Sequence, residues 1–170
     1  MTPTKRSTPD TALLQALRSN LSLLGELAVR YEIETQPERP GDDRPVITCP
    51  EDVGRLLAPE MASLAQEQLR VLLLSTKNHV VGQRVIYQGT IASCQVRAAE
   101  VLRPAVMEAV PKIIICHNHP STDPTPSPED VALTRKLAQA AQLLDVELLD
   151  HVVIGGAQTV SLKDRGLMAA

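Results

Sequence analysis

The sequence predicts an α/β or α+β sandwich around one β-sheet, and three observations support this fold class. Segments typical of strands and of helices follow one another in mixed order along the 170 residues, without an internal repeat. A run of β-branched and apolar residues at 113–116 indicates a buried strand. After Pro128, apolar residues recur with the three- and four-residue spacing of an amphipathic helix.

The composition limits how the core can be built. A chain of 170 residues is long enough for one domain with a sizeable core and an appendage. Because it contains no Phe or Trp and only two Tyr, the core must consist mainly of Leu, Val, Ile and Ala. The net charge of −3 provides no general attraction to nucleic acid, so direct nucleic-acid binding is not expected.

The cysteines and the apolar segments predict the compartment. The sequence has three cysteines, Cys49, Cys94 and Cys116, which are widely spaced and form no C-x-x-C pair. This odd number and spacing argue against a disulfide framework or a Cys-rich zinc module. The sequence shows neither a signal peptide nor an apolar run of membrane-spanning length. We therefore expect a cytoplasmic protein without a membrane partner.

Residues 1–34 are expected to form a polar tail and an amphipathic helix, because leucines recur at three- and four-residue steps from Leu13 to Leu27. This helix either packs on the domain's own core or provides an interface for a homodimer or another partner. Residues 35–45 are dense in Pro, Gly and charge, as is typical of a linker. The main domain is then predicted to span residues 46–170.

The elements of the main domain follow from hydrophobic periodicity and from turn residues. Helices are predicted at 50–64, 98–110 and 128–144, and strands at 67–74, 80–87, 113–116, 148–154 and 159–162. Pro104 is expected to kink or split the second of these helices. Because side chains alternate along a strand, Cys116 is predicted to point into the core, away from the side taken by His117.

The residues that follow the most apolar strand carry the strongest functional signal. His117 and His119 are two positions apart, so in an extended chain both imidazoles project to the same side. Ser127 and Pro128 are suited to begin the next helix as its N-cap and first residue, and Asp130 completes a capping box. Asp130 is therefore expected at a helix N-terminus, close to the end of the strand.

This set of residues is suited to binding a metal ion. Two neutral imidazoles and a carboxylate, with a fourth position left for water, are typical of a catalytic zinc site. Water at such a zinc ion becomes a nucleophile near neutral pH. The same ligands also suit iron or manganese. The alternative is that the histidines are ordinary core or surface residues and that the S-x-x-D pattern is only a helix cap.

The pattern H-x-H-x(7)-S-x(2)-D, formed by His117, His119, Ser127 and Asp130, resembles the JAMM signature of the MPN-type metalloproteases. Over residues 46–164 the sequence also resembles the bacterial RadC-like branch. The segments that carry this resemblance are H-N-H-P-S, P-S-P-E-D, L-T-R-K-L and L-L-D-H. The resemblance implies an α-β-α sandwich around a curved mixed sheet. It also implies a zinc ion held by the two histidines and the aspartate, with Ser127 supporting the oxyanion.

A zinc hydrolase also needs an acid/base that moves a proton from water to the leaving nitrogen, and two glutamates are candidates. Glu67 opens a predicted strand upstream of the histidines, which resembles the place of the catalytic glutamate in the JAMM family. Glu100 matches the glutamate of a P-R-E word in the RadC-like branch, although Ala98 and Ala99 replace its first two residues. We favour Glu67 and keep Glu100 as the alternative.

Two further positions bear on the site. His151 belongs to the L-D-H word and is expected either to support the metal ligands or to pack in the core. Thr122 stands where RadC-like proteins usually have Gly. If this position requires a positive φ, a β-branched residue is costly there.

The metal site predicts a hydrolase, and the bond that suits it is an amide. The resemblance alone implies the substrate, which is a protein or peptide cleaved at a peptide bond or at an isopeptide bond to a ubiquitin-like tail. The alternative is a non-catalytic RadC-like accessory protein, linked to DNA repair or to a partner complex. Full-length RadC-like proteins are expected to carry a helix-hairpin-helix region for binding DNA, and this sequence shows no such hairpin.

Overall fold

The computed structural model describes residues 43–89 and 96–168. The helix predicted within residues 1–34 and positions 35–42 of the predicted linker lie outside these residues. Within the described part of the chain, three helices and five strands are formed. None of the helices in this part is long and apolar enough to cross a membrane.

Each element lies where the sequence predicts a helix or a strand, with ends shifted by at most three residues. The helices are α3 (Pro50–Met61), α4 (Ala98–Met107) and α5 (Pro128–Gln142), and the strands are β1 (Gln68–Leu74), β2 (Val80–Gln88), β3 (Lys112–Asn118), β4 (Glu147–Gly155) and β5 (Gln158–Ser161). Helix α4 is not split at Pro104 and continues to Met107, so the proline removes one backbone hydrogen bond without ending the helix.

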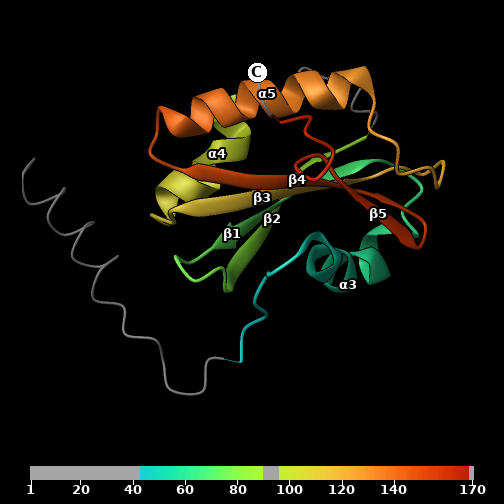
Figure 1. The fold of residues 1–170 in the computed structure, drawn as a ribbon, viewed down its shortest axis with the longest axis horizontal. Coiled ribbons are helices and arrows are strands. Elements are labelled where there is room, and N and C mark those ends of the chain that lie inside the picture. The colour runs from blue at the N-terminus through green and yellow to red at the C-terminus, as the bar shows by residue number, and fades with distance from the viewer. Residues whose placement is uncertain (1–42, 90–95, 169–170) are drawn as a thin grey trace, which may run out of the picture. The chain divides into compact units, whose positions relative to one another are not determined.

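The five strands form one mixed sheet in the order β2-β1-β3-β4-β5. Strands β3 and β4 are parallel, and the other neighbouring pairs are antiparallel. Figure 1 shows α4 and α5 on one face of this sheet and α3 on the other. This arrangement confirms the predicted sandwich of helices around one mixed sheet.

The core is divided by the sheet into two apolar clusters, and strand β3 contributes to both. Ile113 and Ile115 pack with residues of α4 and α5, whereas Ile114 and Cys116 pack with residues of α3. Cys116 is fully buried, as predicted, and burial raises the pKa of its thiol well above the usual range. We therefore assign Cys116 a packing role, because reactivity requires the thiolate.

The same alternation decides where the functional residues lie. His117 continues the series of Ile113 and Ile115, so it faces the layer of α4 and α5 at the carboxyl end of β3. Asn118 faces the opposite side. Strand β3 is central, paired with β1 on one side and β4 on the other, so residues from both neighbours can reach this end.

Candidate metal centre

Three side chains converge where the end of β3 meets the N-terminus of α5. His117 lies near the end of β3, His119 follows the strand directly, and Asp130 lies in the first turn of α5. The Nε2 atoms of the two histidines are 2.9 Å apart. Asp130 Oδ1 lies 3.3 Å from His117 Nε2, and Asp130 Oδ2 lies 3.5 Å from His119 Nε2. The three predicted ligands are thus within reach of a single ion.

These separations fit the size of a metal ion. Ligand atoms about 2.0–2.2 Å from a tetrahedral zinc ion are roughly 3.3–3.6 Å from one another. The two histidine–aspartate separations, 3.3 Å to Oδ1 and 3.5 Å to Oδ2, fall within this range, although each is measured to a different oxygen of the carboxylate. The histidine–histidine separation of 2.9 Å is shorter by a few tenths of an ångström and equals a hydrogen-bond distance.

The N-terminus of α5 fixes the orientation of Asp130. Ser127 is the N-cap, and its hydroxyl oxygen accepts a hydrogen bond from the Asp130 backbone N–H at 3.1 Å. In return, Asp130 Oδ2 accepts from the Ser127 backbone N–H at 2.8 Å and from its hydroxyl at 2.7 Å. The predicted capping box is confirmed. Because Ser127 engages Oδ2, the Oδ1 atom is left to face His117.

His119 is held by backbone carbonyl groups. Its backbone N–H donates to the carbonyl oxygen of Ile154 in β4 at 2.8 Å, which attaches the loop to the sheet. Its Nδ1 lies 2.8 Å from the carbonyl oxygen of Asp123. A carbonyl oxygen only accepts, so Nδ1 carries the proton. In the neutral ring, the Nε2 atom that faces His117 and Asp130 therefore carries a lone pair.

His117 has a second contact behind the metal site. Its Nδ1 lies 2.8 Å from Nε2 of His151, a fully buried residue of β4. Burial lowers the pKa of His151 well below the ordinary value, so this ring is neutral. His151 Nδ1 in turn lies 2.5 Å from the hydroxyl of Thr134 in α5. His151 thus contacts a candidate ligand directly, in addition to lying within the core.

The charges of the site shift the pKa values of its members. Burial raises the pKa of Asp130, but hydrogen bonds that His117 and His119 donate when protonated, the attraction of the His117 charge and a hydrogen bond from Ser127 outweigh burial and hold this pKa far below its usual range. The hydrogen bond with Asp130 raises the pKa of His119, against the opposing effect of burial. The negative charge of Glu67 adds to this rise. The site therefore attracts positive charge.

Strand β1 places Glu67 next to the candidate ligands. In the antiparallel pairing of β1 with β3, Leu69 lies opposite His117. Continuing this register by two residues brings Glu67, which directly precedes β1, to the level of His119. The effect of the Glu67 charge on the pKa of His119 agrees with this placement.

The side chain of Asn118 fixes the backbone on both sides of Glu67. Its Oδ1 accepts a hydrogen bond from the Gln68 backbone N–H at 2.8 Å. Its Nδ2 donates to the Gln66 carbonyl oxygen at 3.1 Å. Asn118 is buried, so these bonds are protected from water. The residue between the two histidines thus connects the candidate metal ligands to the candidate acid/base.

Glu100, the alternative acid/base, lies in the first turn of α4. Its side chain is exposed and lies 3.7 Å from the Arg97 guanidinium as an i,i+3 ion pair. An acidic residue in the first turn is favoured by the helix dipole, so a structural role accounts for this position.

The loop between His119 and Ser127 packs tightly against the end of β4. A Cβ atom at Gly155 would lie 2.4 Å from the Pro124 nitrogen and 2.6 Å from the Thr122 carbonyl oxygen. Both are backbone atoms of the loop, so only glycine permits this approach. The close contact holds the loop that carries His119 and Asp123.

Thr122 is strained, because its φ is 66°, the left-handed region that is unfavourable for a β-branched residue. The strain costs roughly 1–2 kcal/mol, of which the flexibility of unfolded glycine offsets about half. We expect Thr122→Gly to raise the free energy of unfolding by about 0.5–1 kcal/mol, measured by urea titration. Thr125→Gly, at an exposed loop threonine without positive φ, is the control and should destabilise. Equal destabilisation by both variants would contradict the strain.

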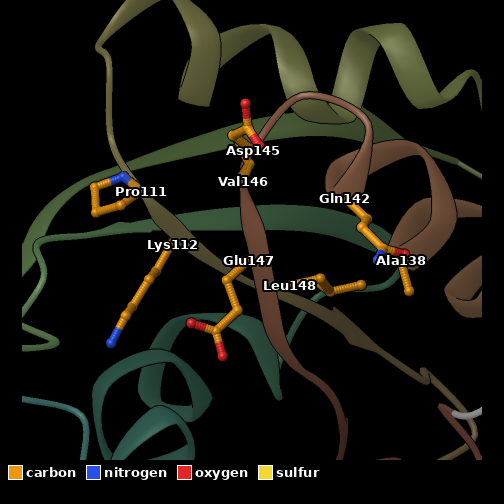
Figure 2. A pocket seen from close by; sticks show the side chains of 8 residues that line it. All are labelled: Pro111, Lys112, Ala138, Gln142, Asp145, Val146, Glu147 and Leu148. Atoms are coloured by element: carbon orange, nitrogen blue, oxygen red, sulfur yellow. The ribbon is translucent and has the colours of Figure 1, made fainter. Parts of the chain in front are cut away.

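A pocket lies at the other end of the same strands (Figure 2). Pro111 and Lys112 at the start of β3, Val146 and Glu147 at the start of β4, and the end of α5 form it. Its volume is about 500 Å³. The lining residues of this pocket include none of the three candidate ligands, so the pocket is separate from the candidate metal centre.

Sequence reasoning did not single out Asn118 or Thr134. Thr134 lies four residues after Asp130, on the same face of α5 and one turn away, and this spacing is the signal that would have identified it. Asn118 gives a weaker signal, because its partners Gln66 and Gln68 lie about fifty residues away in sequence.

Comparison with known proteins agrees with the geometry of the site. The profile of the RadC-like JAB domain matches residues 47–167. The chain belongs to this family. The chain is 42% identical over 149 residues to a UPF0758 protein of Shouchella clausii, covering 88% of this chain and 63% of that protein. It is 46% identical over 127 residues to one of Roseiflexus sp. and 48% identical over 126 residues to one of Chloroflexus aurantiacus, covering 75% and 74% of this chain.

The chain spans 63%, 54% and 55% of the lengths of these three relatives. The family match over residues 47–167 includes the complete H-x-H-x(7)-S-x(2)-D segment of this chain. The resemblance to the RadC-like branch is confirmed.

Proposed function

We propose that this RadC-like domain is a zinc-dependent hydrolase of amide bonds. One observation carries the proposal, namely the convergence of His117 Nε2, His119 Nε2 and the Asp130 carboxylate at separations of 2.9–3.5 Å. Because His119 Nδ1 donates its proton in a hydrogen bond to the backbone carbonyl oxygen of Asp123, a neutral His119 presents a lone pair to the other two groups. Such groups repel one another unless a proton or a metal ion lies between them.

The residues present fit a zinc ion. Two imidazole nitrogens and one carboxylate leave a fourth position open, as in catalytic rather than structural zinc sites. When bound, zinc supplies an activated water and polarises the carbonyl group of the substrate.

Within this proposal, Glu67 moves the proton. Its carboxylate accepts a proton from the attacking water and delivers it to the amide nitrogen, which then leaves as an amine. Asn118 holds the backbone on both sides of Glu67, which keeps the carboxylate at the level of His119. Ser127 supports the oxyanion of the tetrahedral carbon by redirecting the hydroxyl proton that it otherwise donates to Asp130.

The proposed substrate is a protein or peptide, cleaved at a peptide bond or at an isopeptide bond to a ubiquitin-like tail. The metal chemistry supports amide hydrolysis in general, and the choice of tail rests on family resemblance. Fold and function are separable, so the substrate has to be tested with defined compounds.

The decisive experiment combines metal content with hydrolysis. We expect one zinc ion per chain in the wild type by elemental analysis, and loss of zinc in His119→Ala. His79→Ala, at a histidine outside the centre, is the matched control and should retain zinc. Quenched fluorescent peptides and an isopeptide-linked tail should be cleaved by the zinc form, should resist cleavage after chelation, and should be cleaved again when zinc is restored.

Three other results would change this conclusion. Zinc binding without cleavage of any peptide or isopeptide would overturn the hydrolase and favour the accessory protein. Iron or manganese in place of zinc would support the proposed metal centre and change the identity of its ion. Absence of any metal from the wild type would overturn the proposal as a whole.

A further inference from the structure

A chain of buried hydrogen bonds joins two of the candidate metal ligands on the side away from the ion. It runs from His117 Nδ1 to His151 Nε2 at 2.8 Å, and from His151 Nδ1 to the Thr134 hydroxyl at 2.5 Å. The hydroxyl also lies 2.6 Å from the backbone carbonyl oxygen of Asp130. His117, His151 and Thr134 are at most 1% exposed, so water cannot replace any partner.

The carbonyl of Asp130 sets the direction of every proton in this chain. A carbonyl oxygen only accepts, so the single hydroxyl proton of Thr134 lies between Thr134 and Asp130. The hydroxyl oxygen must then accept from His151 Nδ1, which therefore carries the ring proton. His151 Nε2 is left as an acceptor, and His117 Nδ1 must be the donor to it.

We propose that Thr134 and His151 are positioning residues that fix the tautomer of His117, so that its Nε2 presents a lone pair to the metal ion. The inference rests on the metal centre of the proposed function. His119 obtains the same tautomer from a single carbonyl group, that of Asp123, whereas His117 obtains it through two further side chains. The chain of hydrogen bonds begins at the backbone carbonyl of Asp130 in the first turn of α5. One candidate ligand therefore orients another.

Without the Thr134 hydroxyl, the direction of the chain is lost. His151 could then carry its proton on Nε2 and donate it to His117 Nδ1, which would place the proton of His117 on Nε2. A protonated Nε2 cannot bind a metal ion. Partners behind metal-binding histidines typically change metal affinity by about 10- to 100-fold, and we expect an effect of this size.

The experiment compares Thr134→Val, which has a similar shape but no hydroxyl, with Thr134→Ser, which keeps it. Zinc dissociation constants are measured by competition with a chromophoric chelator. We expect the dissociation constant to rise about 10-fold or more in Thr134→Val, and to stay near that of the wild type in Thr134→Ser. Neither measurement depends on hydrolysis.

The tautomer is read directly by nitrogen–proton correlation NMR of histidine-labelled, metal-free protein at mildly alkaline pH. The protein has only four histidines whose signals must be assigned. We expect the His117 proton on Nδ1 in the wild type and in Thr134→Ser, and on Nε2 in a substantial fraction of Thr134→Val.

Three results would overturn the inference. The first is a His117 proton on Nε2 in the metal-free wild type, a result that requires no variant to fold. The second is an unchanged dissociation constant in Thr134→Val. The third is weaker binding without a change of tautomer, which would indicate altered packing. Failure of the wild type to bind any metal would instead refute the proposed function, so the two failures are distinguishable.

Discussion

Replacement of Glu67 by Gln is expected to lower the rate of amide hydrolysis by about 10²- to 10⁴-fold, the usual contribution of a positioned acid/base. Gln has nearly the same shape and cannot take up a proton. The zinc content should remain at one ion per chain, because Glu67 is not among the three converging ligands. The measurement is kcat/KM on a cleaved peptide, together with elemental analysis of the same sample.

Glu100→Gln is the matched control, because Glu100 is the other candidate for the acid/base. Its carboxylate is exposed and paired with Arg97, so we expect activity within about twofold of the wild type, as for ordinary surface substitutions. A large loss in Glu100→Gln with normal activity in Glu67→Gln would reverse the assignment. A large loss of zinc in Glu67→Gln would show that Glu67 acts through the metal site rather than on the proton.

The convergence of the three candidate ligands could be predicted from the sequence because each part of it follows from local rules. Two-residue periodicity brings His117 and His119 together, and the capping preferences of Ser127 and Pro128 fix the start of α5. The same rules predicted the burial of Cys116. These signals depend on residues close together in the sequence, so they can be identified without knowledge of the tertiary structure.

The surroundings of the ligands could not be predicted in the same way. The contact of His117 with His151 requires that β3 and β4 pair in parallel with Ile115 opposite His151. A change of register by one residue would direct His151 to the other face of the sheet. The contact with Thr134 further requires α5 to pack on that face. Both depend on tertiary structure, which periodicity does not specify.

In the loop after His119, the sequence indicated one of two structural features and not the other. The sequence indicated that Thr122 occupies a position usually filled by Gly, and the structure gives it a positive φ. The requirement for Gly155 was not predicted, because it arises from the approach of the loop backbone at Thr122 and Pro124. A glycine required by a distant segment carries no local signal.

Replacement of Asp130 by Asn is expected to weaken zinc binding by on the order of 100-fold or more, since a structural zinc ion with four ligands binds with about 10–16 kcal/mol. Asn keeps the shape and an oxygen that can accept from Ser127, but it lacks the charge that attracts the ion. The dissociation constant from chelator competition measures this directly.

The loss should also appear in thermal unfolding. Free zinc at a hundred times the wild-type dissociation constant stabilises the folded state by about 2.7 kcal/mol, which raises Tm by about 5–10 °C for a domain of this size. At the same zinc concentration, Asp130→Asn should gain only about 0.4 kcal/mol. The Tm of the variant should therefore hardly respond to zinc.

Asp52 provides a control for the capping role of Asp130. It occupies the same third position of α3, where its Oδ2 accepts from the backbone N–H groups of Thr48 and Cys49 at 2.8 and 3.1 Å and from the Thr48 hydroxyl at 2.7 Å. Asp52→Asn should lose the same kind of cap and keep the full response of Tm to zinc. If both variants lost that response, destabilised helix termini would explain the result. If only Asp130→Asn lost the response of Tm to zinc, the Asp130 carboxylate would be a metal ligand as well as part of the cap of α5.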